Sequence, residues 1–394
     1  MGNSDSDKNG KDEIIKILQN KGWNIKSIIE MIPIVLRLFK GEYPYMVKGT
    51  KPPISIEHSY NEDTVKNFLD EPLDLYNYLS RFKIVELDDC YMLLTKFHHI
   101  IYDGISSNVF KHDFQVLLDG GRVDIDDSFL RLSAFDQQIK DTDKYVEAVN
   151  FYDSMLSDIS DVKGLIKDNS SEGFSITTFD FEFNSDAIKS FLNKTGLSEN
   201  ALFTTVFAYT LSRFSASDKV SFSMIDNGRD RFNDYDSIGL YAGVVPLLIE
   251  CKDQEIDSFL EYSSDIVYNV LKYNYYPLFL IAQRYGFDVN VIFQYVPKWI
   301  SYDVIDDENI GINSSEGTGE LINDLLESTD KLIAEFIVQM LENDENYSLM
   351  FVYSNEYSDK MVKDFADTYN LVLSNILNAD MSSKLSSISK KDLN

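Results

Sequence analysis

The chain has very few of the cysteines and histidines that form disulfides and bind transition metals, with two cysteines and four histidines among 394 residues. Cys90 and Cys251 stand far apart, and neither has a histidine at the spacing of a metal site. Both lie in apolar, strand-like surroundings, so we expect buried, reduced thiols and no metal site. Reduced thiols are typical of a cytoplasmic enzyme, and the cytoplasm is the predicted location.

Long apolar runs and basic side chains are also scarce. No run of 18 apolar residues occurs, and the polar, acidic first residues are unlike a secretory signal. Lysine and arginine number 36 against 65 acidic residues, a formal charge of −29. Nucleic acid and anionic membranes repel such a chain, so neither is a predicted partner. No phosphate-binding glycine loop or serine nucleophile motif is present, so ATP-dependent activation is expected elsewhere.

The composition predicts a well-packed globular protein. Hydrophobic residues make up 44% of the chain, with 26 Phe and 24 Tyr. A length of 394 residues suits two or three domains. Strand and helix patterns alternate, which predicts an α/β (α+β) fold; they include helices at 12–21 and 25–40, a strand at 91–97 and helices at 105–118 and 129–156. The predicted organisation is a disordered lead-in (1–11), an N-terminal lobe (12–165), a C-terminal lobe (170–380) and a flexible tail (381–394).

The most informative segment is residues 98–104, which read His-His-Ile-Ile-Tyr-Asp-Gly and follow the apolar strand at 91–97. An imidazole titrates near neutral pH and can accept and return a proton. Neighbouring side chains on a strand face opposite ways, so only one histidine can face a cleft, and we expect it to be His99. The functional interpretation is a general base or a group that positions the nucleophile; the structural alternative is a pair of histidines that cap the edge of a sheet.

This motif, with others in the same order, resembles the condensation domains of nonribosomal peptide synthetases, which are relatives of chloramphenicol acetyltransferase. The resemblance extends over roughly residues 30–380. The other matching segments are Leu73–Leu75, Leu79–Arg81, Ser133–Phe135, Ile238–Leu247, Asn274–Phe279 and Val291–Tyr295.

The resemblance implies a fold and a reaction. The fold is two chloramphenicol acetyltransferase-like lobes in a V-shaped pseudodimer, each a mixed sheet flanked by helices. The reaction is attack of a carrier-bound amine on an upstream carrier-bound thioester, which forms an amide bond. Donor and acceptor peptidyl carrier proteins and adjacent synthetase domains are then the partners. Substrates arrive on the carriers' 4'-phosphopantetheine arms, and no cofactor is bound by the chain itself.

The resemblance also assigns roles to residues. The catalytic residues it implies are His99, His98 and Gly104. His99 is the residue near the amine, and the amide of Gly104 at a helix start helps to stabilise developing negative charge. Asp103 is architectural and pairs with Arg229, which ends the sequence Asp-Asn-Gly-Arg. The alternative is that Arg229 is a solvated loop charge; a buried carboxylate needs a partner, which favours the pair.

Two departures from the family pattern keep other functions open. The family's opening Ser-x-Ala-Gln motif has no counterpart, and residues 31–39 match its Arg-His-x-x-Leu-Arg segment only weakly. The resemblance therefore implies an N-terminal lobe shortened by about forty residues. The alternatives are a stand-alone acyltransferase that uses acyl-CoA, epimerisation of a tethered residue, and a catalytically impaired module that docks carrier proteins.

Overall fold

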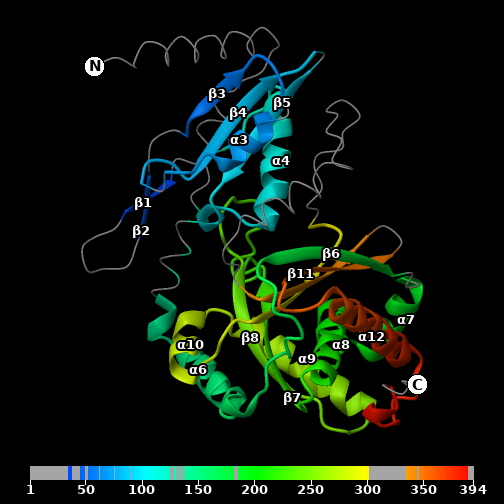
Figure 1. The fold of residues 1–394 in the computed structure, drawn as a ribbon. Coiled ribbons are helices and arrows are strands. Elements are labelled where there is room, and N and C mark those ends of the chain that lie inside the picture. The colour runs from blue at the N-terminus through cyan, green and yellow to red at the C-terminus, as the bar shows by residue number, and fades with distance from the viewer. Residues whose placement is uncertain are drawn as a thin grey trace. The chain divides into compact units, whose positions relative to one another are not determined.

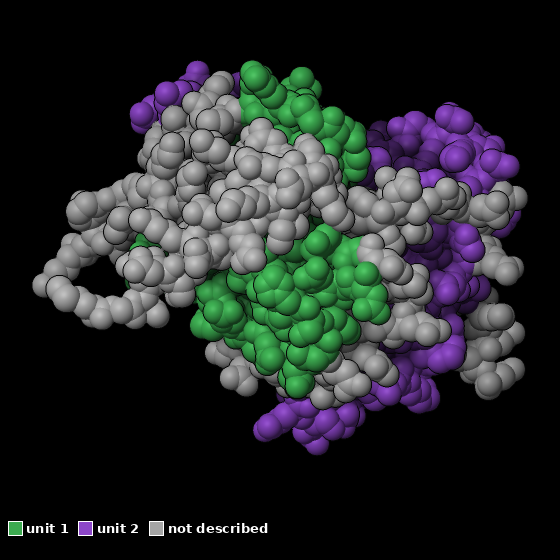
Figure 2. Space-filling model, turned by 90° about the horizontal axis from the view of Figure 1, so that it is seen from above, with its two compact units in different colours: residues 1–133, 229–241, 302–313 green, residues 134–228, 242–301, 314–394 purple. Residues whose placement is uncertain are grey.

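The protein is represented by a computed structural model, which describes residues 34–37, 45–48, 52–300 and 334–388, apart from 62, 75, 89, 125–127, 130–131, 133–134, 136–137, 182–184 and 344–345. The chain forms two compact units, coloured in Figure 2. Unit 1 comprises residues 1–133, 229–241 and 302–313, and unit 2 comprises 134–228, 242–301 and 314–394. Among the helices described, none is long and apolar enough to cross a membrane.

Among its described residues, unit 1 has a three-stranded mixed sheet and the helices α3 and α4 (Figure 1). The strand order is β3-β4-β5, with β3 parallel and β5 antiparallel to β4. A separate antiparallel pair, β1 and β2, precedes this sheet in the chain. The elements are β1 (Ile34–Arg37), β2 (Tyr45–Lys48), β3 (Ile54–Glu57), α3 (Asp63–Asp70), β4 (Ser80–Glu86), β5 (Tyr91–Phe97) and α4 (Gly104–Leu118).

The two faces of the β3-β4-β5 sheet are covered by different helices because side chains alternate along its strands. Phe82 and Ile84 of β4 pack against aromatic and aliphatic side chains of α4. The opposite face carries charged groups: Lys83 pairs with Glu57 of β3, and Lys96 donates hydrogen bonds to carbonyls at the carboxyl end of α3. A lysine at a helix carboxyl end is stabilised by the helix dipole.

Unit 2 is built on a six-stranded mixed sheet with strand order β6-β11-β10-β9-β7-β8 (Figure 1). β7, β9 and β10 are parallel, and the other neighbouring pairs are antiparallel. The strands are β6 (Phe174–Phe181), β7 (Lys219–Asp226), β8 (Gly243–Glu250), β9 (Val291–Val296), β10 (Phe336–Glu342) and β11 (Tyr347–Ser354). The helices are α6 (Asp143–Met155), α7 (Ser185–Thr195), α8 (Glu199–Phe214), α9 (Ile256–Lys272), α10 (Leu278–Tyr285) and α12 (Asp359–Asn378).

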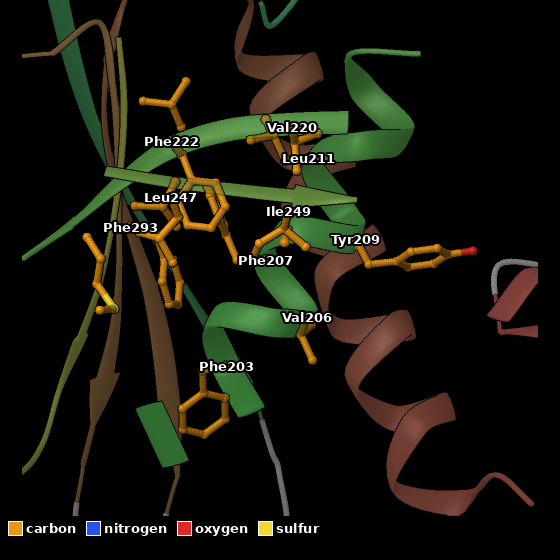
Figure 3. Close-up of a cluster of buried hydrophobic side chains, with 14 of the residues drawn as sticks. Phe203, Val206, Phe207, Tyr209, Leu211, Val220, Phe222, Leu247, Ile249 and Phe293 are labelled. Atoms are coloured by element: carbon orange, nitrogen blue, oxygen red, sulfur yellow. The ribbon is translucent and has the colours of Figure 1, made fainter. Parts of the chain in front are cut away.

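The core of unit 2 is centred on α8, which lies between the sheet and the helices α9 and α12. Every residue from Ala201 to Ser212 is buried, because this helix is apolar around most of its circumference. In Figure 3 the ring of Phe207 lies among side chains from three strands, including Phe222 of β7 and Phe293 of β9. The ring centroids of Phe222 and Phe293 lie 5.0 and 4.6 Å from the centroid of Phe207.

Three expectations from the sequence differ from the structure. The helix predicted for 25–40 is wrong over residues 34–37, which form β1; Ile34 and Val35 are β-branched, and such residues favour strands. The tail predicted to be flexible from 381 is anchored up to 388, where Leu385 and Ile388 are buried. Of the thiols, Cys251 is buried but Cys90 is exposed. The lead-in at 1–11 and the helix at 12–21 lie outside the described residues.

The compact units also divide the chain differently from the contiguous lobes 12–165 and 170–380. Helix α6 belongs to unit 2 because its aromatic side chains join that unit's core. Phe151 lies 5.2 Å from the ring of Tyr273, and Tyr152 lies 5.6 Å from that of Tyr276. Residues 229–241 belong to unit 1, although the strands on either side of them, β7 and β8, belong to unit 2.

Candidate functional site

The segment between β5 and α4 carries the histidine motif. After the strand ends, the amide of His98 donates to the carbonyl of Leu79 at 2.8 Å, and residues His99–Ile101 form one turn of 3₁₀ helix. The histidines are therefore not both on a strand, as the sequence suggested; the chain turns between them. Ile101 anchors this turn, with 1% of its surface exposed. The turn brings two imidazoles into different environments.

His99 is exposed, and one of its ring nitrogens is held by the backbone. Its Nδ1 lies 2.6 Å from the carbonyl oxygen of Tyr102. A carbonyl can only accept a hydrogen bond, so Nδ1 carries the proton. In the neutral ring, Nε2 then has the lone pair and is the atom that can take a proton from a substrate.

His98 has the opposite arrangement. Its Nδ1 accepts a hydrogen bond from the amide of Ile100 at 3.1 Å and so caps the 3₁₀ turn. An accepting Nδ1 places the proton of the neutral ring on Nε2. Partial burial, and secondarily the nearby His99, lower the pKa of His98. His98 therefore stabilises the turn through Nδ1, and its Nε2–H can donate a hydrogen bond but cannot act as a base.

Helix α4 begins at Gly104, directly after Asp103, which is its N-cap. The amide of Gly104 is one of the first N–H groups of the helix, which have no intrahelical partner and lie at the positive end of the helix dipole. Asp103 accepts from the amide of Ser106, and the Ser106 hydroxyl accepts from the amide of Asp103, so a reciprocal capping box fixes this end.

The carboxylate of Asp103 is buried and points away from solvent, with 4% of the residue exposed. Its Oδ1 lies 2.8 Å from each of three donors: the amide and the hydroxyl of Ser106, and Nη2 of Arg229. Its Oδ2 accepts from the amide of Tyr241 at 3.0 Å. The predicted ion pair between Asp103 and Arg229 is therefore present, and the alternative of a solvated Arg229 is wrong, because its side chain is fully buried.

Arg229 joins the motif to the segment 229–241. Its guanidinium donates to five oxygen atoms, two in the α4 cap and three backbone carbonyls of its own segment. It also lies over the ring of Tyr241, 4.3 Å from the centroid. The carbonyls are those of Asp234, Ser237 and Gly239. A planar group with a fixed fork of donors suits such a set.

Sequence reasoning missed three residues of this network: Ser106, Gly239 and Tyr241. Ser106 lies at the capping-box spacing after Asp103, but serine is not the usual residue there, so the signal is weak. Both the amide and the carbonyl of Gly239 hydrogen-bond the Ser106 hydroxyl, at 3.0 and 2.9 Å. Backbone contacts of this kind leave no signature in the sequence.

In the described part of the chain, no three metal-binding side chains converge.

The fold and the site together define a class: a mixed α/β protein of the chloramphenicol acetyltransferase type, with a histidine motif at a strand-to-helix turn. The family model for the condensation domain matches residues 52–390. The chain therefore belongs to the condensation-domain family. The resemblance seen in the sequence and the predicted fold class, two lobes each with a mixed sheet flanked by helices, are confirmed.

Individual relatives are distant. Nonribosomal peptide synthetase kk1B of Curvularia clavata is 23% identical over 242 residues, 58% of this chain. The chain spans only 2% of the length of that curated relative.

Solved structures share the fold at low identity. The X-domain from teicoplanin biosynthesis, in complex with OxyB, has a TM-score of 0.71 at 14% identity, covering 96% of this chain and 89% of that one. The epimerization domain of the third module of tyrocidine synthetase B has a TM-score of 0.69 at 14% identity, covering 95% and 90%. The first condensation domain of the calcium-dependent antibiotic synthetase, with a substrate analogue, has a TM-score of 0.67 at 15% identity, covering 93% and 88%.

Proposed function

We propose that this chain catalyses amide formation in nonribosomal peptide synthesis, and that an acceptor amine on one carrier protein attacks the thioester of a donor on another. Membership of the condensation-domain family supports the class of reaction. The single observation that carries the mechanism is the exposed imidazole of His99 with Nδ1 bound to a carbonyl, which leaves Nε2 as the base.

The proposed step balances in atoms and charge. The amine nitrogen forms a bond to the thioester carbon while Nε2 of His99 accepts the proton that the amine loses. The amide of Gly104, at the helix N-terminus, is the proposed donor to the oxyanion. The carbon–sulfur bond then breaks, and the proton on Nε2 passes to the departing thiolate of the phosphopantetheine arm. His98 supports this site by holding the turn, and Asp103 and Arg229 fix the start of α4.

The test compares histidine variants with donor and acceptor carrier proteins loaded with aminoacyl groups. We expect His99→Ala to keep its fold, followed by circular dichroism, and to lower the rate of amide formation by about 10²- to 10⁴-fold, the usual contribution of a general base. His112→Ala is the matched control, because it removes an exposed imidazole from α4 in the same unit. An unchanged rate for His99→Ala would exclude His99 as the base.

Three other functions are distinguished by the same loaded carrier proteins. A stand-alone acyltransferase would transfer from acyl-CoA as well as from a loaded carrier, so acyl-CoA is the second donor. A docking module would bind loaded carriers without transfer; the X-domain that shares this fold is itself in complex with another protein, OxyB. Inverted stereochemistry at the tethered residue, without transfer, would instead indicate epimerisation. Transfer and epimerisation are read from the products formed by the wild-type chain, and docking is read from its binding of a loaded carrier in the absence of product.

A further inference from the structure

Tyr102 contacts His99 twice through its backbone. Its amide donates to the carbonyl of His99 at 3.3 Å, and its own carbonyl accepts from the His99 ring at 2.6 Å. Tyr102 is extended, with φ −155° and ψ 133°, and lies between the 3₁₀ turn and the N-cap of α4. Its carbonyl therefore takes part in neither helix and is available to the imidazole.

The side chain of Tyr102 is held by an aromatic stack. Its ring lies parallel to that of Phe97, the last residue of β5, with centroids 4.3 Å apart and planes 7° apart. Phe97 is itself fixed by edge contacts, at 5.6 Å from Phe82 of β4 and 5.4 Å from Phe110 of α4. The Ser107 side chain hydrogen-bonds the phenol, and burial raises the pKa of Tyr102 to about 12. The ring is thus tied to both the sheet and the helix.

The neighbours of Tyr102 in the chain are fixed as well. Ile101 is buried beside Leu79, and Asp103 is held by the α4 cap and Arg229. The orientation of the peptide that carries the Tyr102 carbonyl is thereby restrained on both sides, while the stack with Phe97 restrains the residue between them. An aromatic pair of this kind contributes about 0.5–1.5 kcal/mol beyond its buried area.

We propose that Tyr102 is a positioning residue: its stack on Phe97 holds its carbonyl against Nδ1 of His99 and so selects the ring tautomer and orientation that leave Nε2 basic. A neutral imidazole in water exchanges its proton between the two nitrogens. A fixed acceptor at Nδ1 removes that choice, and it also restricts rotation of the ring. The consequence for catalysis rests on the proposed function, but the tautomer does not.

Nitrogen NMR of the histidine rings tests the tautomer directly, because protonated and unprotonated ring nitrogens have distinct chemical shifts. The chain has only four histidines, so the signals of His99 are assigned as those missing from His99→Asn. We expect the wild type and Tyr102→Phe, which keeps the stack, to show Nδ1–H at neutral pH. Tyr102→Ala should show a mixture of the two tautomers.

A control separates positioning from general loosening of the aromatic cluster. Phe114→Ala removes an aromatic side chain at the far side of the cluster, where Phe114 stacks on Phe110 at 6.0 Å without contacting Tyr102. It should leave the His99 tautomer unchanged. In the transfer assay, Tyr102→Ala should lower kcat by about 10- to 100-fold with KM for the carriers unchanged, as expected for a misplaced catalytic group.

The outcomes distinguish the two proposals. If Tyr102→Ala keeps pure Nδ1–H, or if Phe114→Ala disturbs the tautomer equally, the positioning role of Tyr102 is overturned whatever the activity. If the tautomer responds as expected but the wild type transfers nothing from any donor, the positioning role stands and the proposed function fails.

Discussion

At the scale of single residues, His98 has a different affinity for a proton in the folded and the unfolded chain. Its pKa is lowered in the fold, chiefly by burial, whereas an unfolded histidine has a pKa of about 6.5. Between these two values the unfolded chain binds more protons, so the free energy of unfolding falls with falling pH. The contribution of neutral His98 is complete above about pH 6.5 and is lost as pH falls from there through the lowered folded value.

The variant His98→Asn isolates this effect. Asparagine can still accept from the amide of Ile100 as an N-cap but does not titrate. We expect the midpoint of thermal unfolding to fall less between pH 7.5 and pH 5 for His98→Asn than for the wild type, because the variant lacks the proton that unfolded His98 binds. Equal decreases would show that His98 binds its proton alike in both states.

At the scale of elements, the segment 229–241 packs so closely against Phe129 that one of its positions excludes any side chain. A Cβ on Gly239 would lie 2.4 Å from two ring carbons of Phe129, and its backbone is bonded to Ser106. We expect Gly239→Ala to lower the free energy of unfolding by about 1–3 kcal/mol, the usual cost of overpacking, and to slow transfer by shifting the cap of α4.

Gly243 provides the matched control from the same stretch of sequence. A Cβ there meets nothing within 4 Å, and its φ is not in the left-handed region. Gly243→Ala should therefore be neutral or stabilise the protein by about 0.4–1 kcal/mol. Urea unfolding followed by fluorescence compares the two variants. Similar stabilities would mean that Phe129 can move aside at no cost.

Elements with a strong local signal were predictable, and those that depend on distant partners were not. The bounds of β5 follow from its hydrophobic pattern, and α4 begins one residue earlier than predicted. β1 was missed because a short apolar run inside a predicted helix has the same appearance in either structure. β10 was not predicted. It is held in place by hydrogen bonds to β9 and β11, and its own residues do not encode those partners.

The candidate site shows the same division. The local motif at 98–104 and the helix start after Asp103 could be read from the sequence. The pairing of Asp103 with Arg229 came only from the family resemblance, because 126 positions separate the two residues. The tautomers of His98 and His99 depend on two backbone groups, the amide of Ile100 and the carbonyl of Tyr102. The orientation of a backbone group cannot be read from the residue types in the sequence.

At the scale of the whole molecule, the path of the chain makes unit 1 depend on a residue supplied by a later part of the sequence. β7 ends in unit 2, the chain enters unit 1 at Arg229, and it returns to unit 2 at β8. The Arg229 side chain has no exposed surface, and the Asp103 side chain has 2% exposed. Both charges are thus removed from water and depend on each other.

Replacement of Arg229 by methionine tests this dependence, because it keeps an unbranched side chain but removes the charge and every donor. The Asp103 carboxylate and the backbone carbonyls around it would remain buried without the guanidinium, so we expect the free energy of unfolding to fall by about 3–5 kcal/mol. The control is Arg284→Met, whose pair with Asp153 has side chains 49% and 39% exposed; such a pair contributes about 0–1 kcal/mol. Thermal and urea unfolding measure both variants, and the difference should persist in high salt because the buried pair is poorly screened. A loss for Arg229→Met no larger than that for Arg284→Met would mean that unit 1 does not need the crossing segment to hold the start of α4.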